Sequence, residues 1–148
     1  MTMRSMLVFL GLFTVSGCSP DARSCTDVGC EDGVVVVMSS GEDAGSGPLP
    51  DGTYLVAVTA DGARSTATCT VNVGKPDCVG AAGPLLFFSS GSDIEVHVGT
   101  RSKAVGIDVT RNGVALMSQT VAPAYHDVSP NGAGCSPTCA EATVHVGL

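Results

Sequence analysis

Two histidines of the chain have matching neighbours and could bring imidazoles to one metal ion. His97 and His145 each lie in a Val-His-Val-Gly stretch. Side chains alternate between the two faces of a strand, so inward valines place both imidazoles on the outer face. On neighbouring strands, the two histidines and Glu95 could bind zinc, which takes nitrogen and carboxylate ligands. Nothing in the sequence makes the strands neighbours, and an exposed strand histidine needs no metal.

A second candidate site has oxygen-bearing side chains at alternate positions. Asp127, Ser129 and Asn131 precede Gly132, at the spacing with which a calcium loop supplies its first three side-chain oxygens. The last ligand of such a loop is a glutamate, and Thr138 occupies that position. A surface turn, in which Asp and Asn bond their own backbone and Gly132 takes a positive φ, explains the same residues. We predict the turn, and no cofactor.

The chain carries no catalytic signature. It lacks the Gly-x-Ser-x-Gly motif of a serine hydrolase, and Ser90-Gly91-Ser92 is typical of a turn. The glycine-rich stretch 80–84 lacks the lysine of a phosphate-binding loop. The chain has three histidines and fourteen acidic residues, so the sequence alone does not exclude a catalytic triad of Ser, His and Asp or Glu. A small hydrolase therefore stays a second alternative. We predict that the protein is not an enzyme.

Six of the seven cysteines fall in three closely spaced pairs. An even number of cysteines in an exported chain indicates disulfides rather than metal ligands. Because Gly, Pro or Asp lies near each pair, we predict three local bonds: Cys25–Cys30, Cys69–Cys78 and Cys135–Cys139. An alternative for the first is that Cys30 joins the N-terminal segment to the domain.

Short strands and glycine-rich turns must position all of these residues. We predict seven or eight strands, over residues 34–38, 53–59, 64–73, 85–88, 94–98, 105–109, 114–121 and 142–146. In the strand over 53–59, alternation directs Tyr54, Val56 and Val58 to one face. In the strand over 64–73, it directs four residues inward: Ala67, Cys69, Val71 and Val73. Asp61-Gly62 and Asn112-Gly113 are strong hairpin signals. The pattern predicts an all-β fold, an antiparallel β-sandwich forming one domain over residues 33–148.

The negative net charge of the chain makes nucleic acid an unsuitable partner. The net charge is -7, and the basic residues are scattered along the chain. A nucleic-acid-binding protein needs a basic stripe to neutralise phosphates. We therefore expect no nucleic-acid partner.

The N-terminus has the three parts of a secretory signal peptide. Arg4 precedes a short apolar run, and small residues follow at Ser16 and Gly17. The run is far below the roughly 20 apolar residues of a membrane-spanning helix. The last four residues, Val15-Ser16-Gly17-Cys18, resemble the lipobox of bacterial lipoproteins. The alternative is an ordinary cleaved signal with a chance cysteine.

The lipobox resemblance implies a role for each part of the N-terminal region. Residues 1–17 would be the signal peptide, Cys18 the lipidated first residue, and residues 18–32 a tether to the cell envelope. In that family an Asp after the cysteine retains the protein in the inner membrane. Here the position is Ser19, which implies the outer membrane if the host has one.

Two weaker resemblances concern the domain. The Gly-x-Tyr-x-Val pattern within residues 51–73 resembles immunoglobulin-like and transthyretin-like accessory domains. Tyr125, Pro130-Asn131-Gly132, Cys135 and Cys139 resemble the tails of uncharacterised cysteine-containing bacterial lipoproteins. Together they imply a non-catalytic binding or structural accessory module, anchored to the membrane by lipid and able to meet other envelope proteins. Its recognition loops would be 41–52, 74–84 and 122–139. The first alternative is a calcium- or zinc-binding envelope protein.

Overall fold

The computed structural model describes residues 25, 27–41, 47–82 and 85–148. The predicted signal peptide 1–17, the lipidation residue Cys18 and residues 19–24 of the predicted tether lie outside these described residues. No helix within the described ranges is long and apolar enough to cross a membrane. The strands are β1 (Gly33–Ser39), β2 (Gly52–Ala60), β3 (Ala63–Asn72), β4 (Lys75–Ala82), β5 (Leu86–Ser90), β6 (Asp93–Val98), β7 (Val105–Arg111), β8 (Val114–Val121), β9 (His126–Val128) and β10 (Cys139–Gly147).

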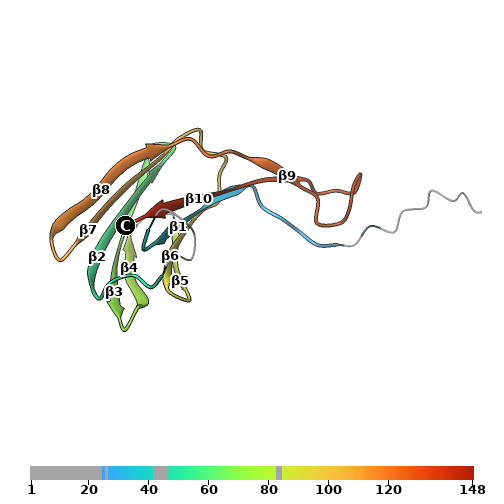
Figure 1. Cartoon of the computed structure of the whole chain (residues 1–148). Coiled ribbons are helices and arrows are strands. Elements are labelled where there is room, and N and C mark those ends of the chain that lie inside the picture. The colour runs from blue at the N-terminus through green and yellow to red at the C-terminus, as the bar shows by residue number, and fades with distance from the viewer. Residues whose placement is uncertain (1–24, 26, 42–46, 83–84) are drawn as a thin grey trace, which may run out of the picture.

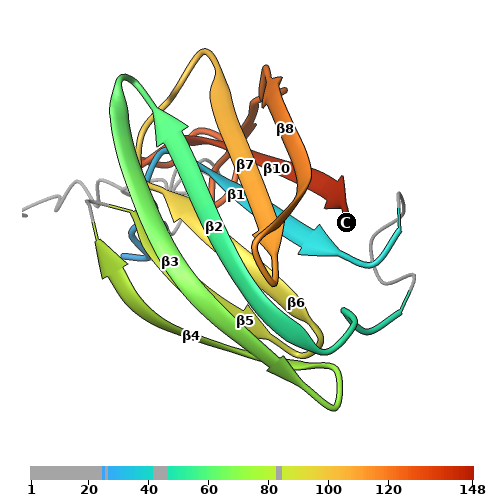
Figure 2. The ribbon, with the colours of Figure 1, turned by 90° about the vertical axis from the view of Figure 1, so that its left-hand side faces the viewer.

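The strands form two packed sheets, which confirms an all-β fold (Figures 1 and 2). One sheet has the order β5-β6-β1-β10-β9 and the other the order β4-β3-β2-β7-β8. The second sheet is antiparallel throughout. In the first, β1 pairs in parallel with β10 and antiparallel with β6. The expected purely antiparallel arrangement is therefore wrong for this sheet, because the first and last strands lie side by side and run the same way.

The core lies between the inner faces of the two sheets. Alternate residues of each central strand point inward, as a period of two requires. Val36 and Val96 lie on one inner face, and Val56 and Ile107 on the other, and all four have an exposed fraction of 0%. The predicted inward faces of β2 (Tyr54, Val56, Val58) and of β3 (Ala67, Cys69, Val71) are buried, with the exception of Val73.

Val73 is 82% exposed because the turn after β3 begins at Val73 itself, one residue before the predicted loop 74–84. Both predicted hairpin turns are present, and their first residues, Asp61 and Asn112, have positive φ as a type I′ turn requires. The β3–β4 turn has the same geometry, with Val73 at φ 52° and Gly74 at φ 68°. A Cβ on Gly74 would lie 2.5 Å from a Pro48 carbon, so only glycine permits this approach.

Two strands lie where loops were expected, so the described part of the chain has ten strands rather than seven or eight. β4 falls in the expected loop 74–84, and its Pro76 and Asp77 are residue types that strands usually avoid. As an edge strand β4 tolerates them, because one side of its backbone has no ladder to complete. β9 falls in the expected loop 122–139 and has only three residues, too few to show alternation.

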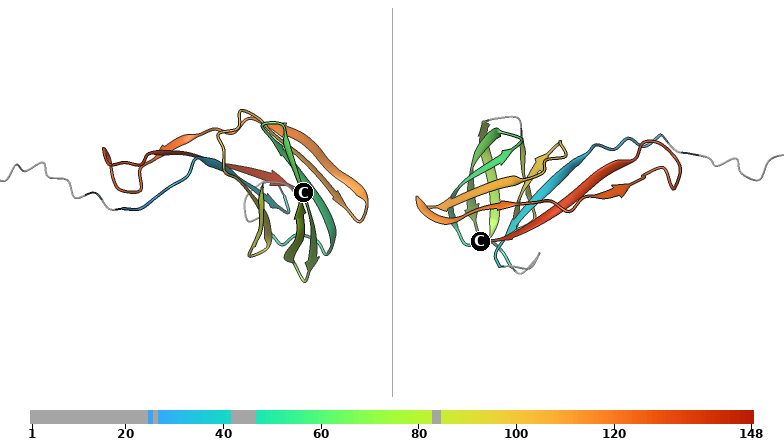
Figure 3. Two further views of the ribbon diagram at one scale, coloured as in Figure 1. Left: turned by 180° about the vertical axis from the view of Figure 1, so that it is seen from behind. Right: turned by 90° about the horizontal axis from the view of Figure 1, so that it is seen from above.

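Part of the chain projects from the sandwich as an arm toward the N-terminal side (Figures 1 and 3). We call it the stalk, and define it as Cys25, residues 27–32 and residues 126–141. Disulfides Cys25–Cys135 and Cys30–Cys139 hold the two segments together. The predicted local bonds Cys25–Cys30 and Cys135–Cys139 are therefore wrong, and the alternative in which Cys30 joins the N-terminal segment to the domain is confirmed. Cys69–Cys78 is confirmed, across the β3–β4 pair.

Residues 126–141 form a hairpin whose returning arm runs beside residues 27–32, continuing the parallel pairing of β1 with β10, and this explains the disulfides. The two cysteines of each segment are spaced along its length, so each meets a cysteine across the stalk rather than its own neighbour. Residues 27–32 of the predicted tether are thus bound to the domain.

Candidate functional site

A hollow of about 550 Å³ lies on the outer face of the β5-β6-β1-β10-β9 sheet, beside the base of the stalk. We call it the groove. Its polar lining residues are Glu31, Asp32, His97, His126, Glu141 and Thr143, and Val35 and Leu86 are its apolar side chains. Residues from β1, β6, β9 and β10 therefore meet in one depression.

The sheet register explains why the surface is hollow there. Thr143, Val35, His97 and Leu86 form one row of paired residues across β10, β1, β6 and β5. The adjacent row has His126 and Glu141 on one side, but Gly33 on β1. A Cβ on Gly33 would lie 2.6 Å from the Val98 carbonyl oxygen. The close approach of β1 and β6 thus requires glycine, and the missing side chain leaves the floor of the groove open.

The groove is rich in hydrogen-bond acceptors. Three carboxylates line it, and none of its described lining residues is lysine or arginine. Asp32 Oδ1 accepts the backbone N–H of Ala140 at 2.7 Å, which fixes that carboxylate on the stalk. His97 Nε2 lies 3.5 Å from Glu95 Oε2. Such a lining suits a ligand that brings donors, such as hydroxyl or ammonium groups.

The structure does not bring the predicted zinc residues together. His97 lies on β6 and His145 on β10, and β1 runs between these strands. His97 pairs with Val35 and His145 with Val37, so they also lie at different levels along β1. His145 does not line the groove, whereas His126 does. No group of three His, Cys, Asp or Glu side chains in the described part of the chain is arranged to hold a metal ion.

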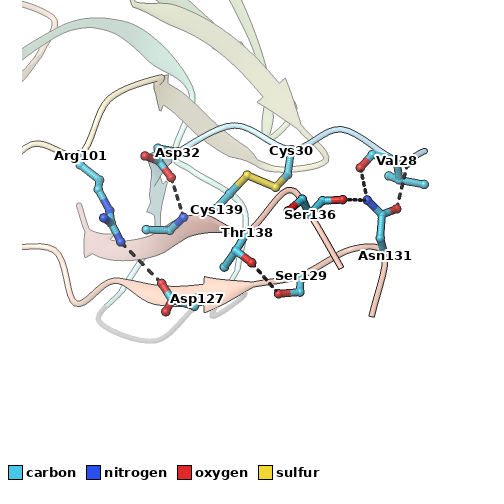
Figure 4. The surroundings of a disulfide bond; sticks show 11 residues. Val28, Cys30, Asp32, Arg101, Asp127, Ser129, Asn131, Ser136, Thr138 and Cys139 are labelled. Carbon is cyan, nitrogen blue, oxygen red and sulfur yellow. Dashed lines mark hydrogen bonds and ion pairs between the residues drawn. A yellow bond between two sulfur atoms is a disulfide. The ribbon is translucent and has the colours of Figure 1, made fainter. Parts of the chain in front are cut away.

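The three predicted calcium residues lie in the stalk and each has a different partner (Figure 4). Asp127 Oδ1 lies 3.5 Å from Arg101 Nη2, and the Ser129 and Thr138 hydroxyls are 3.1 Å apart. Gly132 has a positive φ of 94°, as the turn interpretation predicts.

Asn131 departs from that interpretation because it bonds across the stalk. Its Oδ1 accepts the Val28 N–H at 2.9 Å, and its Nδ2 donates to the Val28 carbonyl at 3.0 Å. Nδ2 also donates to the Ser136 carbonyl at 2.7 Å. The side chain is 8% exposed and completes a backbone-like pair with Val28. Its role is to join the two segments of the stalk, which no local sequence pattern could indicate.

A second polar cluster joins the sandwich to the stalk. Asp61 Oδ2 accepts hydrogen bonds from the Thr100 and Ser102 hydroxyls at 3.0 and 2.9 Å. The Tyr125 hydroxyl, just before β9, donates to the Ser102 carbonyl at 3.1 Å. Burial is the main cause that raises the pKa of Tyr125 above its ordinary value of 10.0. These bonds fix the β2–β3 turn, the segment after β6 and the start of the stalk relative to one another.

Comparison with known proteins gives no relative: no family model, curated protein or solved structure matches the chain.

Proposed function

We propose that the protein is an exported lipoprotein of the cell envelope, anchored through Cys18 and acting as a non-catalytic binding module. The observation that carries the proposal is the covalent stalk. Two disulfides join the segment that follows the lipobox to Cys135 and Cys139, near the start of the last strand, β10. Structural disulfides form and persist in oxidising compartments outside the cytosol. A signal-like N-terminus and a stalk that needs oxidation thus support the same compartment.

The stalk also supports the anchor assignment. Six residues, 19–24, separate Cys18 from Cys25. A seven-residue step spans at most about 25 Å when fully extended. A lipid on Cys18 would therefore hold the stalk tip close to the membrane, with the sandwich on the far side of the stalk. Ser19 favours the outer membrane, by the lipoprotein resemblance.

We place binding in the groove. It combines volume, acceptor chemistry and a floor that the glycine of β1 keeps open. The Asp61 cluster and the disulfides hold its stalk-side wall in place, and a preorganised wall lowers the entropy cost of binding. The partner class that this lining fits is an envelope component with exposed hydroxyl or ammonium groups.

We further propose that the sandwich is of the immunoglobulin-like or transthyretin-like type. Tyr54, near the start of β2, donates from its hydroxyl to the Pro50 carbonyl at 2.7 Å. A tyrosine that bonds a backbone carbonyl a few residues upstream at a strand corner is a hallmark of immunoglobulin-like sandwiches. The bond lies in the Gly-x-Tyr-x-Val segment that carries the sequence resemblance.

Intact-mass and peptide mass spectrometry of the protein expressed with its own signal, without reduction, tests the anchor. The expected product starts at an acylated Cys18 and has no free thiol. Cys18→Ala should abolish acylation while leaving the Cys25–Cys135 and Cys30–Cys139 peptides intact. An unacylated wild-type N-terminus would overturn the anchor, and acyl label that persists in Cys18→Ala would overturn the residue assignment.

Photo-crosslinking in intact cells tests the groove. A photoreactive amino acid at Thr143, in the groove, should give discrete adducts. The matched control is Thr68, on the outer face of the other sheet. Equal adducts from both positions, or none from Thr143, would refute a binding role for the groove.

A further inference from the structure

The two sheets have four edge strands: β5 and β9 in one, and β4 and β8 in the other. An edge strand exposes unpaired backbone N–H and C=O groups, to which another strand can add. Proteins that remain monomeric blunt their edges with charges, proline, short strands or a cover. The four edges of this chain differ sharply in this respect.

Three edges are blunted or short. β4 begins with Lys75, Pro76 and Asp77, so its edge carries both charges and a proline. β5 has five residues and packs against β4, which partly covers both edges on that side of the sandwich. β9 has three residues and includes Asp127.

β8 lacks the charges and the proline that protect the other edges, and it is not short. Its sequence, Val-Ala-Leu-Met-Ser-Gln-Thr-Val, contains no charged residue, no proline and no glycine. No Asp, Glu, Lys or Arg occurs anywhere from Asn112 to Tyr125. Val114 and Leu116 are 66% and 42% exposed. A bulge places Leu116 outside the regular pairing with β7, so the regular part of the edge is 117–121.

We propose that β8 pairs antiparallel with β8 of a second copy of this chain and makes a twofold homodimer. A twofold axis at Gln119 would pair Met117 with Val121 on the inner face, and Ser118 with Thr120 on the outer face. Apolar pairs and hydroxyl pairs are both favourable across strands. Met117 and Val121 already pack at the rim of the core, so pairing would extend the apolar layer across the dimer.

Charge restricts where two copies of this chain can meet. The full sequence has a net charge of -7, and loss of residues 1–17 would remove only the basic Arg4, so two copies repel one another over most approaches. The uncharged run 112–125 is where two identical surfaces can meet without opposing like charges. An antiparallel contact of one strand with its own copy is closed by symmetry, so it yields a dimer and not a fibre. A strand from another protein is the competing occupant, and the experiment separates the two.

Sedimentation of the detergent-solubilised, lipid-anchored full chain tests the proposal. Wild type should sediment as a dimer. Gln119→Lys should shift it to monomer, because it places two ammonium groups opposite each other at the axis. The control Asp77→Lys, on the β4 edge, should remain dimeric. A monomeric wild type, as expected if β8 receives a strand of another protein, would overturn the proposal, as would a Gln119→Lys variant that remains dimeric.

Cross-linking in native membranes tests the register of the proposed β8–β8 pair. Gln119→Cys should form a disulfide-linked dimer on a non-reducing gel, because residue 119 would face its own copy. Thr53→Cys, an exposed residue on β2, is the matched control and should stay monomeric. Peptide mass spectrometry must show the three native disulfides intact in both variants. With the native bonds intact, a Gln119→Cys variant without dimer would rule out this axis.

Discussion

The stalk and the sandwich are held together by different kinds of interaction. In the sandwich, the buried side chains are mostly aliphatic, among them Val36, Val56 and Ile107. In the stalk, the buried residues are the half-cystines Cys135 and Cys139, Asn131 and Ala140. Burial of apolar surface stabilises the first region. Covalent bonds and hydrogen bonds across two chain segments stabilise the second.

Geometry is the reason for this difference. A sandwich has two facing layers, and each covers the inner face of the other. The stalk is a narrow ribbon of β9, the start of β10 and residues 27–32 (Figure 3), with no second layer against it. A few strands without a second layer bury too little apolar surface to be stable alone. The stalk therefore depends on its disulfides more than the sandwich does, because the single sandwich disulfide, Cys69–Cys78, adds to an aliphatic core.

The largest expected effect comes from removing both stalk disulfides. Cys30 and Cys139 are 109 residues apart in the sequence. In the chain-entropy account, closing a loop of that size stabilises by about 4–5 kcal/mol. While Cys25–Cys135 is present, however, the second bond closes only the short loop between the two bridges. The variant with alanine at Cys25, Cys30, Cys135 and Cys139 loses the long loop closure, so its free energy of unfolding in urea should fall by at least about 4–5 kcal/mol. Hydrogen exchange should rise in residues 126–141, while the central strands β2 and β7 remain protected.

The short disulfide of the sandwich provides the control. Cys69 and Cys78 are nine residues apart, and a loop of that size corresponds to only about 3 kcal/mol. Cys69→Ala/Cys78→Ala should raise exchange in β3 and β4 and leave the stalk protected. Equal exchange patterns in the stalk variant and the Cys69→Ala/Cys78→Ala variant would show that stalk and sandwich are one cooperative unit, and the comparison would fail.

A cavity in the core should have the complementary effect. Ile107 is fully buried on β7, and its truncation to alanine is expected to cost about 3 kcal/mol, within the range for aliphatic core residues. The loss should appear in the urea midpoint, with the stalk disulfides still formed. Leu55→Ala is the control, because Leu55 is 48% exposed on the outer face and should change stability by no more than about 0.5 kcal/mol. A larger effect of Leu55→Ala would mean that the outer face is covered in the folded protein.

Asn131 tests the polar part of the stalk. Asn131→Ala leaves the Val28 N–H, the Val28 carbonyl and the Ser136 carbonyl without this partner. The expected loss is about 2 kcal/mol, because three hydrogen bonds across the stalk are lost and each contributes about 1 kcal/mol net. Asn131→Asp keeps the acceptor but turns a carboxylate oxygen toward the Val28 and Ser136 carbonyl oxygens, so at neutral pH its loss should be at least as large. Ser129→Ala removes one exposed hydroxyl contact and should have little effect; if it matched Asn131→Ala, the bonds to Val28 would not be the cause.

The sandwich was more predictable from sequence than the stalk. Alternation in β2, β6 and β7 indicated the buried faces correctly, because burial on one side of a strand imposes a period of two. The Asp61-Gly62 and Asn112-Gly113 turns were readable because they need residues that tolerate positive φ. The turn after β3 was predicted within the loop 74–84, but its first residue was not, because valine rarely takes a positive φ and no local pattern indicates it at Val73.

The stalk and the groove depend on contacts between distant residues, and local patterns do not encode these. Cys25 and Cys135 pair across most of the chain. His126 lines the groove through the three-residue strand β9, whose register with β10 no periodicity can show. Of the predicted metal residues only His97 lines the groove, because His145 lies two residues beyond Thr143 along β10, past the end of the groove.

The smallest expected effect concerns a polar cluster on the outer face of the sandwich. Asp108 accepts hydrogen bonds from Ser118 at 2.6 Å and Arg64 at 2.9 Å. These bonds, that of Ser118 foremost, hold the pKa of Asp108 below its ordinary value of 3.8. A carboxyl with a lowered pKa in the folded state adds stability above its unfolded pKa, and this stability is lost as the pH falls through the folded value.

Ser118→Ala should therefore raise the pKa of Asp108 toward 3.8, as measured by NMR titration of its carboxyl carbon. The wild type should be slightly more stable than the variant at neutral pH, and the difference should vanish in acid, below the folded pKa. The effect is small because the cluster is exposed and water screens it. The stalk disulfides do not titrate, so their contribution should persist at the same acidic pH. If Ser118→Ala cost as much as Asn131→Ala, surface bonds would matter as much in the sandwich as in the stalk, and the distinction between the two regions would not hold.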